Sequence, residues 1–334
     1  AQFNLTNLYT TGEITYTGTG IMDSDEDGVA DNIDDFDTDP NLIGVDYTPD
    51  AGTMGTLTFE DKYPVKGDYD FNDLVMGYKY RHILDPENKV KAMHYLYTIR
   101  AMGASNALGF AIQFPTINAS VGYSATLEKN SEGAIETTAQ AGKTKLTFNI
   151  FANAKTELNS GSKFVNTAAD GEEGEDDMVV TDLPTYELIV TFNTAVDSLA
   201  VAVPNNPYIF YTSSPNIEVH LPGQVHSSGV STLSNYPSHS EGDEQDYLTV
   251  NGFPWAKDIQ SMWDFPKEKT SLENAYPAVI TWASSEGSSA TTWYNDETAG
   301  YLQYRSLRKT AHQSYIRNTM RSVVFRGKYN FLGL

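Results

Sequence analysis

The segment "DSDEDGVADNIDD", residues 23–35, gathers carboxylates at a spacing that suits a metal ion. Numbered from the first aspartate, carboxylates occupy positions 1, 3, 5, 9 and 12, and Gly28 occupies position 6. Ca²⁺ takes about six to eight oxygen ligands, and this spacing wraps side chains around one centre. The sequence therefore predicts a calcium site, with a backbone ligand from Val29 and with Ile33 as an apolar anchor. The predicted side-chain ligands are Asp23, Asp25, Asp27, Asp31 and Asp34; Asp35, Asp37 and Asp39 are candidates for a second ion.

The alternative interpretation of this acidic loop is a solvated linker. Fourteen carboxylates precede Lys62, the first basic residue of the chain. Because so many unneutralised charges repel one another, an ordered segment without a cation is unfavourable. The pattern favours a calcium site.

Position 12 separates this loop from an EF-hand, which usually has a bidentate glutamate there, whereas this chain has the shorter Asp34. The flanks are also not amphipathic helices. The segment resembles thrombospondin type 3 or dockerin-style calcium repeats more closely. A single loop of this kind is expected to bind at about 10⁻⁴–10⁻³ M, the range of extracellular modules. This weak affinity predicts a location outside the cytosol.

A second acidic motif is "GTLTFEDKYPVKGDYDFNDLVM", residues 55–76. In an extended chain, Asp68, Asp70 and Asn72 share one face, because side chains alternate between the two sides of a strand. Six oxygen-bearing side chains at one strand end predict a second cation site; the alternative is that they cap turns and bind backbone groups. The residues of this predicted site are Glu60, Asp61, Asp68, Asp70, Asn72 and Asp73.

The elements that position these residues are mostly predicted strands, because apolar and polar residues alternate with period 2. We expect an antiparallel β-sandwich with one short helical segment near residues 266–285. Residues 128–142 and 166–177 are expected to be exposed loops. The predicted strands are "GTLTFED", "DLVMGYKYRHIL", "KVKAMHYLYTIRAM", "ALGFAIQF" ending at Pro115, "KTKLTFNIFA", "TYELIVTF", "SLAVAVP" and a final "SVVFRGKYNF".

Changes in composition along the chain predict its domain organisation. The expected parts are a linker at 1–20, a calcium-binding acidic repeat at 21–45, a β domain at 50–203 and a C-terminal β-rich region at 204–334, packed on the same core or separate from it.

The bulk composition excludes several classes of function. A net charge of −22 argues against nucleic-acid binding and against adsorption to anionic lipid. There is no cysteine, so disulfides and thiolate metal sites are excluded. No apolar run reaches the roughly 20 residues of a membrane span, and the start of the chain lacks a signal-peptide layout. These observations are compatible with a lipid anchor outside this sequence.

Signs of catalysis are missing: the sequence has no GxSxG, HExxH, Walker or dinucleotide motif. We therefore expect no enzyme. His220 and His226 flank "LPGQV" and are expected to be surface histidines. Trp255 and Trp293 are candidates for stacking on a glycan or other ligand, with core packing as the alternative.

The run "FED" followed by "GDYDFNDLV" resembles the LruC-domain family of Bacteroides-type surface proteins, in which a calcium repeat ending in Asp-Pro stands upstream. Further similar stretches extend over roughly residues 21–296. The resemblance implies a β-rich protein on the extracellular face of the outer membrane, often lipid-anchored, whose C-terminal region has no known function. We expect a calcium-binding adhesion or ligand-binding module for a glycan or a surface or matrix protein. The alternatives are a calcium-dependent polysaccharide hydrolase and an assembly component of a surface appendage.

Overall fold

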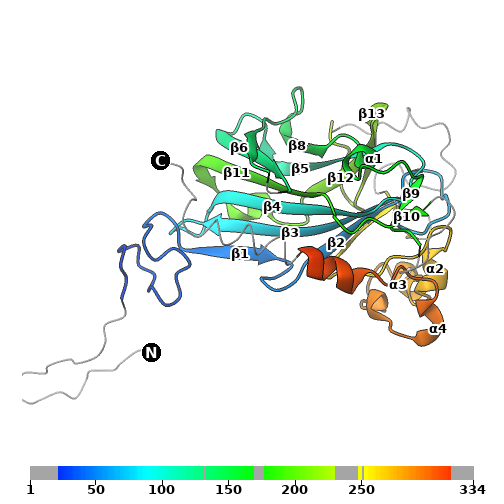
Figure 1. Ribbon diagram of the computed structural model, residues 1–334. Coiled ribbons are helices and arrows are strands. Elements are labelled where there is room, and N and C mark those ends of the chain that lie inside the picture. Colours follow the sequence, from blue (N-terminus) through cyan, green and yellow to red (C-terminus); the bar gives the residue numbers. More distant parts are fainter. Residues whose placement is uncertain (1–21, 131, 169–176, 230–246, 250–251, 317–334) are drawn as a thin grey trace, which may run out of the picture.

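The computed structural model describes residues 22–130, 132–168, 177–229, 247–249 and 252–316 (Figure 1). The protein is mostly β, with antiparallel sheets packed as a sandwich-like core and a few short helices. Within these ranges, no helix is long and apolar enough to cross a membrane. The predicted linker at 1–20 and the predicted final strand after residue 320 lie outside the described residues.

The larger sheet has eight strands, seven of them in the order β14-β2-β3-β4-β11-β6-β7. The eighth strand, β1, pairs with the C-terminal half of β3, and β2 pairs with the N-terminal half. All its pairings are antiparallel. Its strands are β1 (Gly44–Thr48), β2 (Gly55–Phe59), β3 (Leu74–Leu84), β4 (Val90–Ala101), β6 (Tyr123–Lys129), β7 (Ala134–Glu136), β11 (Thr185–Val196) and β14 (Ala256–Ile259).

The smaller sheet has the order β13-β12-β5-β8, so strands from both sides of residue 204 pair directly. A two-stranded parallel pair completes the β structure. The four strands are β5 (Leu108–Asn118), β8 (Lys145–Phe151), β12 (Asn206–Tyr211) and β13 (Ser214–His220), and the parallel pair is β9 (Phe164–Val165) with β10 (Asp177–Met178).

The core lies between the two sheets and is rich in aromatic residues. Alternation puts Tyr80 and Tyr95 on the inner face of the larger sheet, where their rings stack at 4.1 Å. Phe110 of the smaller sheet packs edge-on against Tyr97 at 4.9 Å. Each such buried aromatic side chain stabilises the fold by about 1.5–3 kcal/mol through removal of apolar surface from water. Contacts of this kind fix the two sheets relative to each other.

The helices are short and gather mainly in the C-terminal part of the chain (Figure 1). The predicted helical segment near 266–285 is present as two pieces, α2 (Leu272–Ala275) and α3 (Val279–Ser284), which Pro277 separates. Residues 309–316 are also helical. The remaining helices are α1 (Ala154–Glu157), α4 (Ala299–Leu302) and the 3₁₀ turns η1 (Ser198–Val201) and η3 (Trp293–Asn295).

Three details differ from the sequence-based expectations. The stretch "SLAVAVP" is not a strand but the turn η1, because the Asp197 side chain accepts the N–H of Leu199 at 2.8 Å and starts a helical turn. The expected loop at 128–142 contains β7, which pairs with β6. Strand β5 continues past Pro115 to Asn118, because a break in register accommodates the residue that cannot donate a hydrogen bond.

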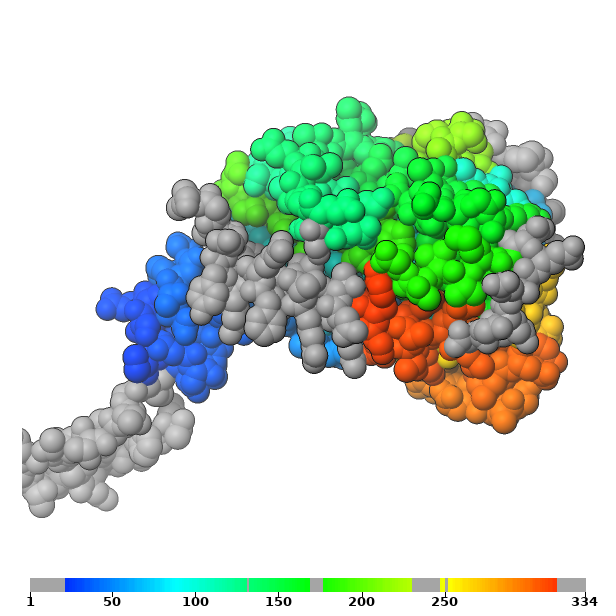
Figure 2. All heavy atoms as spheres, viewed as in Figure 1, coloured from blue at the N-terminus to red at the C-terminus, as the bar shows by residue number. Residues whose placement is uncertain are grey.

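The two acidic segments lie at opposite ends of the molecule. In Figure 1 the acidic loop, in dark blue, is at the end near β1, whereas α2 and α4 lie at the other end. The space-filling view shows residues 22–45 projecting beside the body of strands (Figure 2). The two predicted metal sites are therefore separate.

Candidate metal centres

The acidic loop is shaped by hydrogen bonds from its own backbone to its aspartates. Asp23 Oδ2 accepts the N–H of Gly28 at 3.1 Å, and Asp27 Oδ1 accepts the N–H of Val29 at 2.8 Å. Asp25 Oδ1 accepts the N–H of Asp27 at 3.3 Å. Gly28 has a φ of +97°, a conformation that favours glycine. The loop is thus a series of turns in which each of these carboxylates uses one oxygen to hold the backbone.

The second oxygen of each of these carboxylates is buried and has no hydrogen-bond partner. The same holds for Asp34, whose Oδ1 accepts the N–H of Phe36 at 2.7 Å while its Oδ2 is left unpaired. Asp23, Asp25 and Asp27 each place one carboxylate oxygen within 4.8 Å of the other two. Buried acceptors without a donor are costly, so this arrangement fits a cation that accepts their lone pairs.

Electrostatics in the loop agree with that geometry. Partial burial, followed by the charges of Asp27 and Asp23, raises the pKa of Asp25. Burial, followed by the charge of Asp27, raises the pKa of Asp34 against the opposing effect of the Phe36 N–H. The ionised carboxylates therefore repel one another in the absence of a positive charge.

The other predicted ligands of the loop have varied surroundings. Asp31 is tied to Ser24, whose N–H and Oγ donate to its two oxygens at 2.7 and 2.8 Å. Both oxygens of Asp31 thus hold Ser24, and its role as a metal ligand stays a prediction. Asp35 accepts the N–H of Val45 at 3.1 Å and so joins the loop to β1. Asp37 is exposed.

The anchor of the loop is not the predicted one. Ile33 is 72% exposed, so the expectation that it anchors the loop is wrong. Phe36 instead packs on a small cluster made by Leu42, Ile83 and Ala92. The anchoring residue, Phe36, therefore follows the calcium-type spacing and does not lie within it.

The second acidic motif forms what we call the inner acidic cluster: Glu60, Asp61, Asp68, Asp70, Asn72, Asp73 and, from the C-terminal part of the chain, Glu268. Glu60 Oε1 accepts the N–H of Phe71 at 2.5 Å, and Asp73 Oδ2 accepts the N–H of Asp61 at 2.6 Å. These two hydrogen bonds join the start of the connection between β2 and β3 to its end. The sequence-predicted residues of the motif are therefore brought together.

Unpaired acceptors also occur in the inner acidic cluster. Glu60 Oε2, Asp61 Oδ1 and Asn72 Oδ1 are buried and have no hydrogen-bond partner. Asp68, Asp70 and Glu268 each place one carboxylate oxygen within 4.8 Å of the other two. Sequence reasoning missed Glu268, because it lies about 200 positions downstream and no local motif marks it.

The pKa values of the inner acidic cluster are shifted strongly upward. Burial is the largest cause for Glu60, Asp70 and Asp73, and neighbouring carboxylates add to it. Burial and then the charge of Asp68 raise the pKa of Glu268 to about 7. Among the described residues, the ion pairs with lysine or arginine all lie elsewhere.

The two tryptophans predicted as ligand-stacking residues are buried. Trp255 is 0% exposed and donates from its indole N–H to the Val65 carbonyl at 3.1 Å. Trp293 is 3% exposed and packs among Trp263 and Tyr276. The prediction that these two rings stack on a ligand is wrong, because neither ring has a face exposed to a ligand. Both belong to the core.

The two histidines expected at the surface are also buried. His220 and His226 lie with ring centroids 5.9 Å apart, and both contact Glu218, at 2.8 and 3.3 Å. Burial by itself would raise the pKa of Glu218. The hydrogen bond and charge of His220, the charge of His226 and the hydrogen bond from the Ser227 hydroxyl outweigh burial and lower this pKa to about 2. The neighbouring lysine, Lys143, completes a network in which these polar groups satisfy one another. This cluster is a structural polar network.

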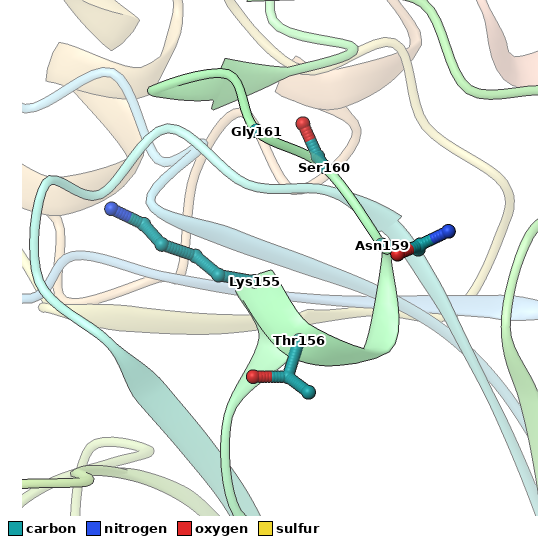
Figure 3. Close-up of a pocket in the computed structure, with 5 residues that line it drawn as sticks. All are labelled: Lys155, Thr156, Asn159, Ser160 and Gly161. Carbon is teal, nitrogen blue, oxygen red and sulfur yellow. The ribbon is translucent and has the colours of Figure 1, made fainter.

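A surface cavity of about 300 Å³ lies beside α1. It is lined by Lys155, Thr156, Asn159, Ser160 and Gly161. Figure 3 shows that Lys155 and Thr156 come from α1 and the other residues from the segment after it, and that the side chains point in different directions. Because no polar groups converge on it, this cavity does not have the character of a binding site.

Comparison with known proteins gives a family and a fold. No curated protein matches the chain. A crystal structure of a "Putative lipoprotein from Bacteroides ovatus" superposes with a TM-score of 0.53 at 15% sequence identity, covering 78% of this chain and 75% of that one. At this identity the likeness shows a shared fold. The model of a domain of unknown function, DUF4842, matches residues 88–294, more than half of the sequence. The chain therefore belongs to the DUF4842 family.

Proposed function

We propose that this protein is a calcium-binding, non-catalytic module of the bacterial cell surface that binds an extracellular glycan or protein. One observation carries the calcium part of the proposal: four buried carboxylate oxygens of the acidic loop, from Asp23, Asp25, Asp27 and Asp34, have no hydrogen-bond donor. A bound cation would pair at once the oxygens of Asp23, Asp25 and Asp27, which have one oxygen each within 4.8 Å of the others.

The donor set fits calcium in its chemistry. All four groups are carboxylates, the hard oxygen ligands that Ca²⁺ prefers, and nitrogen or sulfur donors are absent from the described part of the loop. The carbonyl oxygen of Val29 accepts no hydrogen bond from the described residues, so it is available as the predicted backbone ligand. Softer transition metals would favour imidazole or thiolate ligands.

The position of the loop suggests a bracing role. Phe36 packs on the Ile83 and Ala92 side chains of β3 and β4, and Asp35 binds the backbone of β1. A cation at the turn would stiffen the segment between these two attachments and the N-terminal part of the chain. Calcium would thus fix the orientation of the β-sandwich relative to the N-terminal part of the chain.

The cell-surface location rests on two supporting arguments. A loop of this type binds in a range that extracellular calcium fills and cytosolic calcium does not. The chain also shares its fold with a protein described as a putative lipoprotein, a class that is anchored in the cell envelope. A lipid anchor preceding the sequence would agree with both.

Binding and turnover should be measured together. The protein is applied to an array of polysaccharides and matrix proteins, once in calcium and once in chelator, and released sugar is assayed in parallel. The proposal predicts calcium-dependent binding without release of sugar. Turnover on any polysaccharide would contradict it and favour a hydrolase.

A further inference from the structure

The inner acidic cluster carries an inference that does not depend on the acidic loop, which lies at the other end of the molecule. Its distinguishing feature is that the segment 266–269 closes over it. The carbonyl oxygen of Pro266 accepts the side-chain N–H of Asn72 at 3.1 Å, and the N–H of Lys269 donates to Asp70 Oδ2 at 2.7 Å. Between these two bonds Glu268 faces the cluster.

The orientation of the Asn72 amide is fixed by this contact. Its nitrogen must face the Pro266 carbonyl, since the reverse orientation would bring two acceptors together. The amide oxygen is therefore held on the other side, where it is buried without a donor. Asn72 itself is fully buried. An unpaired acceptor held in place at such a cost indicates a ligand.

Gly103 shows where this oxygen points. A Cβ at Gly103 would lie 1.9 Å from Asn72 Oδ1 and 2.8 Å from Glu268 Oε2. Both oxygens therefore approach the same point of the backbone, and only glycine leaves room for them. Asn72 Oδ1 and the Glu268 carboxylate thus belong to one group of acceptors.

The dimensions of that group suit a divalent ion. Oxygens on opposite sides of a Ca²⁺ at about 2.3–2.6 Å are separated by up to about 5 Å. One oxygen each of Asp68, Asp70 and Glu268 falls within 4.8 Å of the others. The Asn72 oxygen adds a neutral ligand of the kind that calcium sites use.

We propose that Asp68, Asp70, Asn72 and Glu268 form a second site, for a hard divalent cation such as Ca²⁺, that holds the 266–269 segment to the β2–β3 connection. The ion joins two parts of the chain about 200 residues apart. It is a structural site, because the cluster is closed over by backbone on the side of Lys269 and Pro266. Glu60 and Asp61 lie in the same connection, and each adds a buried oxygen without a hydrogen-bond donor.

The test replaces the two proposed ligands whose carboxylates accept no hydrogen bond from the backbone. Within the described residues, the carboxylates of Asp68 and Glu268 accept no hydrogen bond, so Asp68→Asn with Glu268→Gln leaves the hydrogen bonds of the cluster intact. The full chain is stripped with chelator and titrated with CaCl₂ by calorimetry. The double variant Asp25→Asn with Asp27→Asn tests the acidic loop separately. Glu136→Gln, on the exposed strand β7 at the other edge of the sheet, is the matched charge control.

The proposal predicts that the Asp68/Glu268 variant binds one calcium ion fewer than the wild type, whereas Glu136→Gln loses none. In chelator this variant should melt at a higher temperature than the wild type, because two repelling carboxylates are gone, and in calcium it should gain less. Unchanged stoichiometry with an unchanged calcium-induced shift would overturn the second site, and would mean that the cluster is neutralised by protons. Loss of an ion only in the Asp25/Asp27 variant would leave the acidic loop as the sole site.

A second measurement guards against a variant that does not fold. Hydrogen exchange of the wild-type protein in calcium and in chelator reports on the backbone of 266–269 directly. We expect the N–H of Lys269 to exchange at least tenfold faster in chelator. Equal protection in both conditions would contradict a cation at this position.

Discussion

Asn72 donates its side-chain amide to the carbonyl of Pro266 at 3.1 Å, a contact that spans 194 positions of the sequence. It ties the connection between β2 and β3 to the region that carries α2 and α3. The apolar residues around it belong to one cluster, in which Tyr69 and Phe71 pack with Leu272 and Tyr276. The C-terminal helical region therefore packs on the acidic motif. A change of charge in that motif should affect the stability of both regions.

Replacing Asp25 by alanine should weaken calcium binding by several-fold or more. The change removes an unpaired buried oxygen from the acidic loop and also the turn that Asp25 makes with the N–H of Asp27. Hydrogen exchange should show residues 22–45 opening before the sandwich does. Glu26→Gln is the matched control, because Glu26 is an exposed carboxylate of the same loop. Equal loss of affinity in both variants would show that only net charge matters.

Replacing Gly103 by alanine should abolish the effect of calcium at the inner acidic cluster. The new Cβ would collide with Asn72 Oδ1 and push it away from Glu268. We expect one calcium ion fewer by calorimetry. Gly161→Ala is the control, because no atom lies within 4 Å of the corresponding Cβ. A Gly103→Ala protein that binds as much calcium as the control would speak against the cluster as a cation site.

Acid should destabilise the protein through His312. Burial, together with the charges of Arg100 and Arg308, lowers the pKa of His312 from 6.5 to about 2, and its Nδ1 accepts the Nε–H of Arg100 at 3.2 Å. Below pH 6.5 His312 binds a proton in the unfolded chain but stays neutral in the folded protein. Stability therefore falls as the pH decreases through this window, by about 2 kcal/mol between pH 6.5 and about 5.

The variant His312→Gln isolates this contribution. Glutamine keeps an acceptor for Arg100 but does not titrate, so the dependence of unfolding free energy on pH should be flatter by that amount. Denaturant unfolding of both proteins at about pH 7 and about pH 5 measures the difference. Parallel curves for the two proteins would rule out His312 as the source.

Replacing Phe110 by alanine should cost about 3–5 kcal/mol of unfolding free energy. Its ring joins the two sheets by packing against Tyr97 at 4.9 Å and Phe59 at 6.1 Å. The loss should be the same in calcium and in chelator, because the aromatic contacts of the ring involve none of the proposed metal ligands. Ile135→Ala on the exposed strand β7 should change stability by less than about 0.5 kcal/mol. Denaturant midpoints with equal slopes give both values.

Local patterns predicted β3 and β4 well: both strands lie within the predicted stretches "DLVMGYKYRHIL" and "KVKAMHYLYTIRAM". They failed at "SLAVAVP", since one hydrogen bond from the Asp197 side chain turned an alternating stretch into a 3₁₀ turn. They also misplaced Trp255, because its burial depends on Tyr63 and Tyr69, which come from a distant part of the chain.

The grouping of carboxylates in the acidic loop was predictable, because Asp23, Asp25 and Asp27 are close in sequence and their spacing alone brings them together. Glu268 and Gly103 were not, since folding alone brings them to the inner acidic cluster from separate segments. The same limit explains His220 and His226, which Glu218 gathers into a buried network. Sequence spacing finds local sites, whereas sites assembled from separate segments need the fold.

The measurement that tests the central claim most directly is a calorimetric calcium titration of the chelator-stripped protein, with a thermal melt at each end point. The account predicts binding between micromolar and millimolar affinity and a higher melting temperature in calcium, because an ion that binds only the folded state stabilises it. Absence of heat together with an unchanged melting temperature would contradict it and would make the acidic loop a solvated linker.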